Sequence, residues 1–235
     1  MTHPGPQVSV IVPIYNESGL VPDLVLYLAS LDASEVIVVD GGSDDGTWQR
    51  LHDLNPGELL CLRAPRSRAA QMNRGAVRAG GDLLLFLHAD TRLSPHWLSS
   101  TTAALARKPE RRWGRFDVRF DRAGPVLELV ALAMNLRSSM TSICTGDQAI
   151  FVYRDDFLAV GGFAPIPLME DIDLSRRLRR RSFALRVRAP ATTSSRRWRA
   201  QGTLRTIVWM WWLRWLYWWG APASTLAQRY YKKHR

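Results

Sequence analysis

Val8–Ile14 (VSVIVPI) and Glu35–Val39 (EVIVV) are the two stretches that decide the fold. Each is a short run of apolar, mostly β-branched residues, which is the pattern of a strand buried on both faces of a parallel sheet. A helical pattern over residues 18–31 lies between them. Strand, helix and strand at this spacing predict a βαβ unit, because parallel neighbours need a long crossover connection.

The alternation of strands and helices continues along the chain. In the first half we expect further strands at 58–62 and 82–87, and helices at 45–54, 67–79 and after Ser94, with Ser94 as N-cap and Pro95 in the first turn. In the second half we expect an antiparallel or edge strand at 115–120, a strand at 148–152, and helices at 125–136 and 170–181. The pattern predicts an α/β fold with a mostly parallel sheet flanked by helices.

Polar residues follow three of the expected strands directly. They form the clusters Tyr15-Asn16-Glu17, Asp40-Gly41-Gly42-Ser43 and His88-Ala89-Asp90. In open α/β sheets, ligands bind outside the carboxyl ends of the strands. We therefore expect the three clusters to meet at one edge of the sheet and to form a site there.

The carboxylates in these clusters suggest different roles. Asp40 would repel a phosphate, so we expect it to face the base or the ribose of a nucleotide. Asp90 ends a strongly apolar strand, and Mn²⁺ or Mg²⁺ gripping a diphosphate would explain a charge there; His88 would be a second ligand or a donor to the diphosphate. Glu170 and Asp171 begin an expected helix, where they would act as helix caps or as a general base.

The basic residues are concentrated in the last third of the chain. The 235 residues carry 32 Lys and Arg against 21 Asp and Glu, and from Leu174 onward there are sixteen basic residues and no acidic one. Such a segment suits a phosphate-bearing partner: nucleic acid, anionic lipid or a diphosphate substrate. The two cysteines form neither a metal motif nor a disulfide framework, and no signal peptide precedes the first strand, so we expect a cytoplasmic protein.

Residues 203–220 contain six of the ten tryptophans and are interrupted by Arg205 and Arg214. A spanning helix needs about 20 mostly apolar residues, and tryptophan prefers the membrane interface. We therefore expect a catalytic domain at 1–200 and a basic, tryptophan-rich helical tail at 201–235 that lies on the inner face of the plasma membrane. The alternative is that the tail packs on the domain or on a second copy in a homodimer.

Four segments together resemble family 2 glycosyltransferases with the GT-A fold. They are VSVIVPIYNE, VIVVDGGSDDGT, the strand ending in HAD, and PLMEDIDLSRRL, in the family's order over residues 8–185. The chain is also similar to a bacterial subfamily associated with radical-SAM, selenium- or arsenic-sugar pathways, which carries FLHADT and GDQAIFV. Two positions depart from the family pattern, since Gly41 and His88 stand where aspartates are usual.

The resemblance implies inverting transfer of a sugar from a UDP-linked donor to an acceptor hydroxyl of a lipid or small molecule. It implies that Asp171 is the general base, with Glu170 beside it, and that Asp90 and His88 hold Mn²⁺ or Mg²⁺. The candidate nucleotide-binding residues are Pro13, Tyr15, Glu17, Asp40, Gly42, Ser43, Arg68, Asn73 and Ala89. Residues 194–198 partly match the Q-x-x-R-W motif of processive synthases, with Ser194 in place of Gln, so we do not expect polymer synthesis.

Two other functions remain as alternatives. A sugar-phosphate nucleotidyltransferase would place a basic residue near the first strand, and residues 13–24 contain no Lys or Arg. A basic lipid- or nucleic-acid-binding module would explain the tail but not the three polar clusters at strand ends. We therefore expect a nucleotide-sugar donor as ligand and no nucleic acid.

Overall fold

The computed structural model describes residues 5–55, 57–122, 124–196 and 202–232. The expected boundary between residues 200 and 201, and the residues Arg197 and Trp198 of the partial Q-x-x-R-W match, lie outside these ranges.

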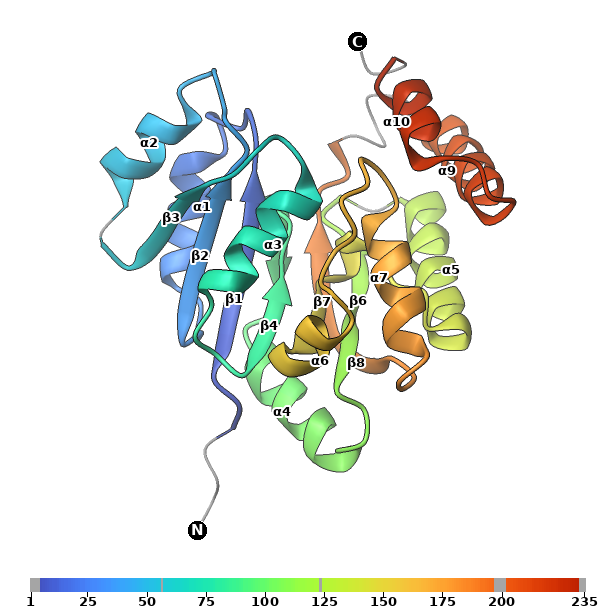
Figure 1. The fold of residues 1–235 in the computed structure, drawn as a ribbon, viewed down its shortest axis with the longest axis horizontal. Coiled ribbons are helices and arrows are strands. Elements are labelled where there is room, and N and C mark those ends of the chain that lie inside the picture. The colour runs from blue at the N-terminus through green and yellow to red at the C-terminus, as the bar shows by residue number, and fades with distance from the viewer. Residues whose placement is uncertain (1–4, 56, 123, 197–201, 233–235) are drawn as a thin grey trace.

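Eight strands form one sheet in the order β3-β2-β1-β4-β7-β6-β8-β5 (Figure 1). Their bounds are β1 Val8–Ile14, β2 Glu35–Asp40, β3 Leu59–Arg63, β4 Leu83–Phe86, β5 Thr91–Leu93, β6 Trp113–Phe120, β7 Ile150–Tyr153 and β8 Leu185–Thr193. The first four strands along the chain pair in parallel. β7 runs antiparallel to β4 and to β6, and β6 pairs in parallel with β8. The expected α/β fold with a mostly parallel sheet is confirmed.

The helices cover both faces of this sheet. Their bounds are α1 Val21–Ala29, α2 Thr47–Leu54, α3 Arg68–Arg78, α4 Trp97–Arg107, α5 Pro125–Thr141, α6 Arg154–Ala159, α7 Glu170–Arg179, α9 Thr203–Trp218 and α10 Ala223–Lys232. Apolar residues of α1, α2 and α4 share one core cluster with the sheet, and those of α3, α6 and α7 share the other. Burial on both faces explains why the parallel strands are continuous apolar runs.

One local expectation was wrong, and another was right in part. Ser94 is not a helix cap, since α4 begins at Trp97 with His96 before it. Its N–H instead donates to the carbonyl of Pro190 in β8. The segment 115–120 was expected to be an antiparallel or edge strand. β6 is antiparallel to β7, but it is not an edge strand, because it lies between β7 and β8. Asp117 of this strand forms ion pairs with Arg115, which is fully buried, and with Arg186 of β8.

The two C-terminal helices pack beside the start of α7. Leu213 of α9 and Leu226 of α10 are fully buried in one cluster with Met169 and Ile172. Figure 1 shows α9 and α10 on the side of α5, away from α2 and β3. None of the helices in the described ranges is both long and apolar enough to cross a membrane.

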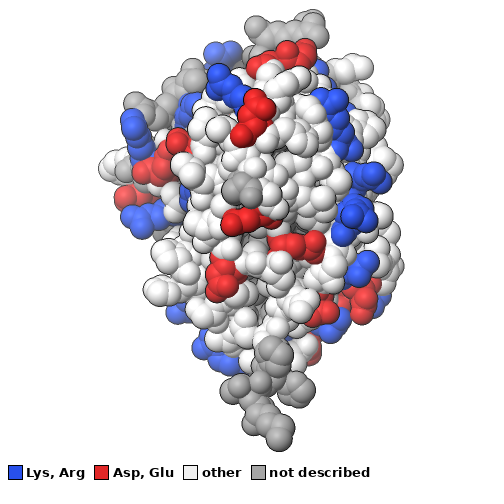
Figure 2. Space-filling model, turned by 90° about the vertical axis from the view of Figure 1, so that its left-hand side faces the viewer, with Lys and Arg blue, Asp and Glu red and all other residues white. Residues whose placement is uncertain are grey.

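The opposite side of the molecule carries both signs of charge. Figure 2 shows the face on the side of α2 and β3, where acidic and basic side chains are interspersed and acidic ones lie near the centre. Among the described residues, this face therefore presents no continuous basic surface.

Candidate active site

The loops that follow β1 and β2 are joined by hydrogen bonds. The N–H of Asn16 donates to Oγ of Ser43 at 2.9 Å, and its side chain donates to Asp44 at 2.8 Å. The N–H of Glu17 donates to Oγ1 of Thr47 at 3.0 Å. Asn16 adopts a left-handed backbone conformation with φ 50°, which asparagine tolerates better than most residues. The first two polar clusters therefore form one surface.

Gln71 of α3 fixes the ends of the two strands beneath these loops. Its buried side-chain amide donates to the carbonyl oxygens of Ile14 and Val39, each at 2.8 Å. The same amide lies 3.1 Å from where a Cβ on Gly41 would stand. A side chain at this position would crowd Gln71, which explains why glycine replaces the usual second aspartate here.

Asp40 is fully buried at the end of β2, and its carboxylate is held by its own loop. It accepts hydrogen bonds from the N–H of Gly42 and from the N–H of Ser43, each at 3.1 Å. Arg63 of β3 lies 3.8 Å away. Gly42 has φ 79°, a conformation that favours glycine, so the turn depends on it. The roles of Asp40, Gly42 and Ser43 toward a nucleotide stay predictions.

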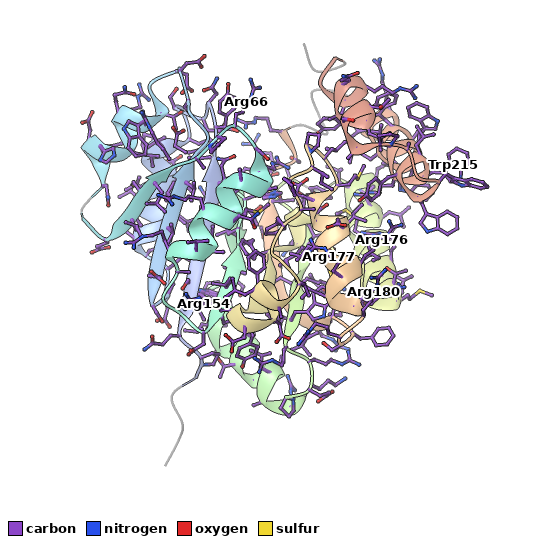
Figure 3. The ribbon with its side chains drawn as sticks, viewed as in Figure 1. Arg66, Arg154, Arg176, Arg177, Arg180 and Trp215 are labelled. Atoms are coloured by element: carbon purple, nitrogen blue, oxygen red, sulfur yellow. The ribbon has the colours of Figure 1, made fainter. Side chains whose placement is uncertain are left out.

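Two arginines contact the first cluster, Tyr15-Asn16-Glu17. The guanidinium of Arg66 lies 4.3 Å from the ring centroid of Tyr15, and Arg196 is 3.3 Å from the carboxylate of Glu17. Figure 3 shows Arg66 near the upper end of the N-terminal half, at the carboxyl ends of the strands. Pro13 is buried within β1 itself. Basic side chains therefore border the expected nucleotide region: Arg66 was not singled out in the sequence, and Arg196 lies in the partial Q-x-x-R-W match.

His88 connects the third cluster to the second half of the chain. Its Nδ1 lies 3.4 Å from a carboxylate oxygen of Asp147, in the 3₁₀ turn Gly146–Gln148. A Cβ on Gly146 would stand 2.3 Å from Nε2 of His88, so this turn lies directly on the imidazole ring. Burial raises the pKa of Asp147, but the hydrogen bond with His88 and the nearby charges outweigh it and lower the pKa to about 2. Asp147 was missed in the sequence, because its partner is 59 residues away.

Asp90 lies beyond His88 and is half-buried. Within the described residues its carboxylate accepts no hydrogen bond and forms no ion pair. The backbone oxygen of its neighbour Ala89 accepts a hydrogen bond from Arg92 at 2.9 Å. The described part of the chain contains no group of three or more metal-ligating side chains. An oxygen ligand with free lone pairs suits a Mn²⁺ or Mg²⁺ ion that takes most of its remaining ligands from substrate phosphates and water.

Glu170 and Asp171 stand at the first turn of α7. Met169 before them has φ 69°, a left-handed conformation that is costly for a side chain of this size. Asp171 accepts a hydrogen bond from the N–H of Gly146 at 2.9 Å, so the turn that covers His88 also orients this carboxylate. Glu170 is buried, and burial first, then the charge of Asp171, raises its pKa.

Cations from two distant elements balance these acids. The charge of Arg68, at the start of α3, acts on both Asp147 and Glu170. Arg214 of α9 faces the charges of Asp171 and Asp147. Asn73, one turn after Arg68, uses its amide to hold the backbone of Phe163 through two hydrogen bonds of 2.8 and 2.9 Å. A role for Asn73 in nucleotide binding stays a prediction.

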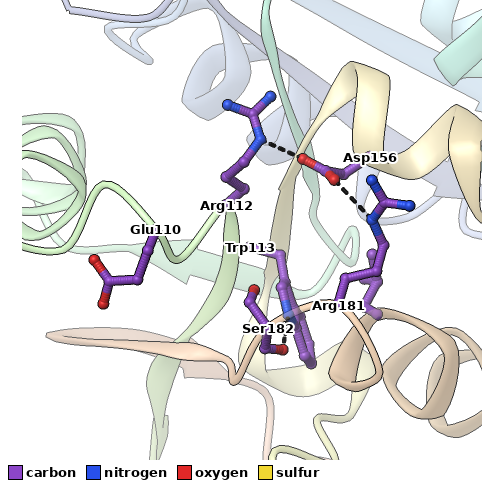
Figure 4. A pocket seen from close by; sticks show the side chains of 7 residues that line it. Glu110, Arg112, Trp113, Asp156, Arg181 and Ser182 are labelled. Carbon is purple, nitrogen blue, oxygen red and sulfur yellow. Dashed lines mark hydrogen bonds and ion pairs between the residues drawn. The ribbon is translucent and has the colours of Figure 1, made fainter.

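Of two pockets among the described residues, one lies away from this edge and the other borders it, because Arg63 and Asn73 line it. One, of about 350 Å³, is lined by Arg112, Trp113 and Arg181, and Figure 4 shows Asp156 placed between Arg112 and Arg181, to which it is ion-paired. The other, of about 440 Å³, lies between β3 and α3. In the first pocket both arginines are thus already paired with Asp156. The chemistry-bearing residues therefore lie on an open edge rather than in a closed cavity.

Comparison with known proteins shows which family the sequence matches. A model of glycosyl transferase family 2 matches residues 9–157. Glycosyltransferase AglE of Haloferax volcanii is 30% identical over 114 residues, which are 45% of this chain and 38% of that relative. The chain thus matches less than half of that protein's length.

Solved structures share the fold at low sequence identity. The mannosyltransferase PcManGT of Pyrobaculum calidifontis, in complex with GDP-Man and Mn²⁺, has a TM-score of 0.59 at 20% identity and covers 82% of this chain and 57% of its own. The glucosyl-3-phosphoglycerate synthase of Mycobacterium tuberculosis, in complex with Mn²⁺, UDP and glucosyl-3-phosphoglycerate, has a TM-score of 0.58 at 20% identity, with 80% and 71% covered. TarS 1–349 of S. aureus with UDP-GlcNAc has a TM-score of 0.62 at 18% identity, with 80% and 58% covered. The fold is that of GT-A glycosyltransferases.

The raised pKa of Glu170 predicts a pH-dependent stability difference between the wild type and Glu170→Gln. Between the ordinary glutamate pKa of 4.5 and the raised value, the folded wild type binds more protons than the unfolded chain. The free energy of unfolding of the wild type, relative to the variant, therefore falls as pH rises through that window. Urea unfolding of both proteins from about pH 4 to about pH 8 measures this.

Glu128→Gln, at an exposed position in α5, is the control and should follow the wild-type profile. Parallel pH profiles of the free energy of unfolding for the wild type and Glu170→Gln would show that ionisation of Glu170 does not destabilise the folded protein.

Proposed function

The chain belongs to glycosyl transferase family 2, and we propose that it is an inverting glycosyltransferase that moves a sugar from a UDP-linked donor to an acceptor hydroxyl. The observation that carries this proposal is the 3₁₀ turn at Gly146–Gln148, which contacts His88 beside Asp90 and donates its first N–H to Asp171. This turn therefore links Asp90, the proposed metal ligand, to Asp171, the proposed general base, at the same edge of the sheet. The likeness to the radical-SAM-associated subfamily stays a prediction.

The residues divide the reaction between them. A bound divalent ion would be held by Asp90, with His88 beside it, and would neutralise the charge that develops on the leaving diphosphate. Asp171 takes the proton of the acceptor hydroxyl, and the oxygen attacks the anomeric carbon on the face opposite the diphosphate. The bond from that carbon to the diphosphate oxygen breaks, which inverts the configuration. The N–H of Gly146 holds the Asp171 carboxylate in place for this step.

Asp90→Ala tests the metal role. UDP should bind the wild type more tightly with Mn²⁺ than with EDTA, because the ion bridges the diphosphate to a carboxylate. In the variant the difference should disappear, while the weaker affinity measured in EDTA remains. Isothermal titration calorimetry under both conditions measures it. Asp155→Ala, at an exposed position in α6, should keep the metal effect. Equal affinities of the wild type in metal and in chelator would refute the proposal.

Asp171→Asn tests the base. The amide keeps an oxygen for the N–H of Gly146 but cannot take a proton, so transfer should fall by about 10²- to 10⁴-fold while UDP affinity stays near that of the wild type. The control is Asp173→Asn on the same turn, since Asp173 is engaged by Arg177 at 2.6 Å. Transfer by Asp171→Asn at the wild-type rate would assign Asp171 to helix capping and place the base elsewhere.

We also propose that α9 and α5 rest on an anionic membrane surface at the inner face of the plasma membrane. Large apolar side chains of both helices are exposed: Leu129, Leu132, Leu136 and Met140 of α5, and Val208, Trp211, Trp215 and Trp218 of α9. Figure 3 shows Trp215 projecting away from the domain. The exposed Arg205 and Arg229 lie on α9 and α10. Indole rings favour the headgroup region, and each basic side chain adds about 1 kcal/mol near anionic lipid.

Point variants test this better than deletion of the tail, because α9 also contributes Leu213 to the core. Trp211→Ala with Trp218→Ala removes two rings that would each bury apolar area worth about 1.5–3 kcal/mol, so binding to anionic vesicles should fall by more than about tenfold. Co-sedimentation at low and high salt measures it. Leu26→Ala on α1, equally exposed, is the control. A wild type that stays in the supernatant at low salt, and elutes as a dimer that the double variant makes monomeric, would assign the rings to a homodimer instead.

A further inference from the structure

Two arginines beside the proposed base have buried nitrogens that nothing satisfies. Nη2 of Arg137 and Nε of Arg214 are buried, and neither has a hydrogen-bond partner among the described residues. Another nitrogen of Arg137 donates to the carbonyl of Ile143 at 3.1 Å, which fixes the side chain against the segment after α5. A buried donor on a cation without an acceptor is costly, and native proteins keep few of them. The presence of two such donors beside Asp171 therefore needs an explanation.

Packing places this arginine pair, Arg137 and Arg214, next to Asp171. Leu213, which precedes Arg214, is fully buried against Met169 and Ile172, the residues that flank Glu170 and Asp171. Ile143, to whose carbonyl Arg137 donates, packs against the same cluster, and the charge of Asp171 acts on both arginines.

The pair also lies on the acceptor side of the base. Arg137 and Arg214 come from α5 and α9, which Figure 1 shows on the side of α7 away from α2 and β3. The loops expected to hold the nucleotide lie on that other side, after β1 and β2. A group bound by the arginine pair would therefore lie beyond Asp171 as seen from the donor.

The local charge favours an anion between the two guanidinium groups. Burial first, and then the positive charge of Arg214, lower the pKa of Arg137 to about 10. Burial likewise lowers the pKa of Arg214, although Asp171 and Asp147 act against it. A guanidinium group offers paired N–H donors in a plane that matches the oxygens of a phosphate. A phosphate would supply the missing acceptors and relieve the repulsion between the two cations.

We propose that Arg137 and Arg214 bind a phosphate group on the acceptor, next to the hydroxyl that Asp171 deprotonates. This inference rests on the proposed transferase function and adds the acceptor's chemical class to it. The phosphate belongs either to a small phosphate ester or to the headgroup of a lipid.

The test is calorimetric titration of the full-length protein, first saturated with UDP and Mg²⁺, with inorganic phosphate and then with hexyl phosphate. The wild type should bind both with the donor site filled. Arg137→Gln and Arg214→Gln should each weaken phosphate binding by about 10- to 100-fold, the range for a hydrogen bond to a charged group. Hexyl phosphate binding more tightly than inorganic phosphate would assign a lipid headgroup, and equal binding a small ester.

Arg107→Gln, at an exposed position in α4, is the matched control and should bind phosphate as the wild type does. Arg214→Lys keeps the charge and should retain part of the affinity if Arg214→Gln fails to fold. Two results overturn the inference: unchanged phosphate affinity in the Arg137 and Arg214 variants, or phosphate binding that UDP abolishes, which would place the pair at the donor diphosphate. Failure of UDP itself to bind would instead count against the proposed function.

Discussion

The bridge from Gln71 to the ends of β1 and β2 is the interaction on which the site depends. Where parallel strands end, their last carbonyl groups lose their partners in the sheet, and buried carbonyls must find others. One side-chain amide donates both to the carbonyl of Val39 and to that of Ile14, which also accepts from the N–H of Gly41, and so ties the two strand ends to α3. The loops that follow leave from fixed points, and their mutual hydrogen bonds can form. Without that bridge, the first two polar clusters would be two independent loops.

Charge balance is the second constraint, and it joins the two halves of the chain. Glu170, Asp171 and Asp147 lie close together, which is unfavourable unless cations face them. His88 and Arg68 come from the N-terminal half, and Arg214 comes from the tail. The acidic cluster can therefore exist only in the assembled fold. The fold thus brings acids from residues 147–171 next to bases from the N-terminal half and from the tail.

The parallel half of the fold could be predicted from sequence because burial on both faces leaves a direct signal, a continuous apolar run. β8 was missed because it has no continuous apolar run: its alternation is clear only over the first four residues, and it includes Arg186, Arg188 and Pro190. The strand-end clusters were found through the rule that ligands bind at such ends. Gln71, Asp147 and Arg214 were missed because each depends on a partner far away in sequence, and nothing in their immediate neighbours marks them. The buried partners of Asp40 and Asn73 show the same limit: residue type suggested a ligand, while the surrounding backbone already uses the side chain.

The left-handed conformation of Met169 has a consequence for how the molecule responds to perturbation. Such a backbone costs about 1–2 kcal/mol for a residue with a side chain, and it persists only where surrounding contacts hold it. Those contacts come in part from Leu213 and Leu226, so docking of the C-terminal helices and the geometry of the first turn of α7 belong to one cooperative unit. Partial undocking, by heat or denaturant, would let residue 169 relax and the helix start reorganise while the eight-stranded sheet remained folded. Loss of activity would then precede loss of global structure, and inactivation and unfolding would have different midpoints.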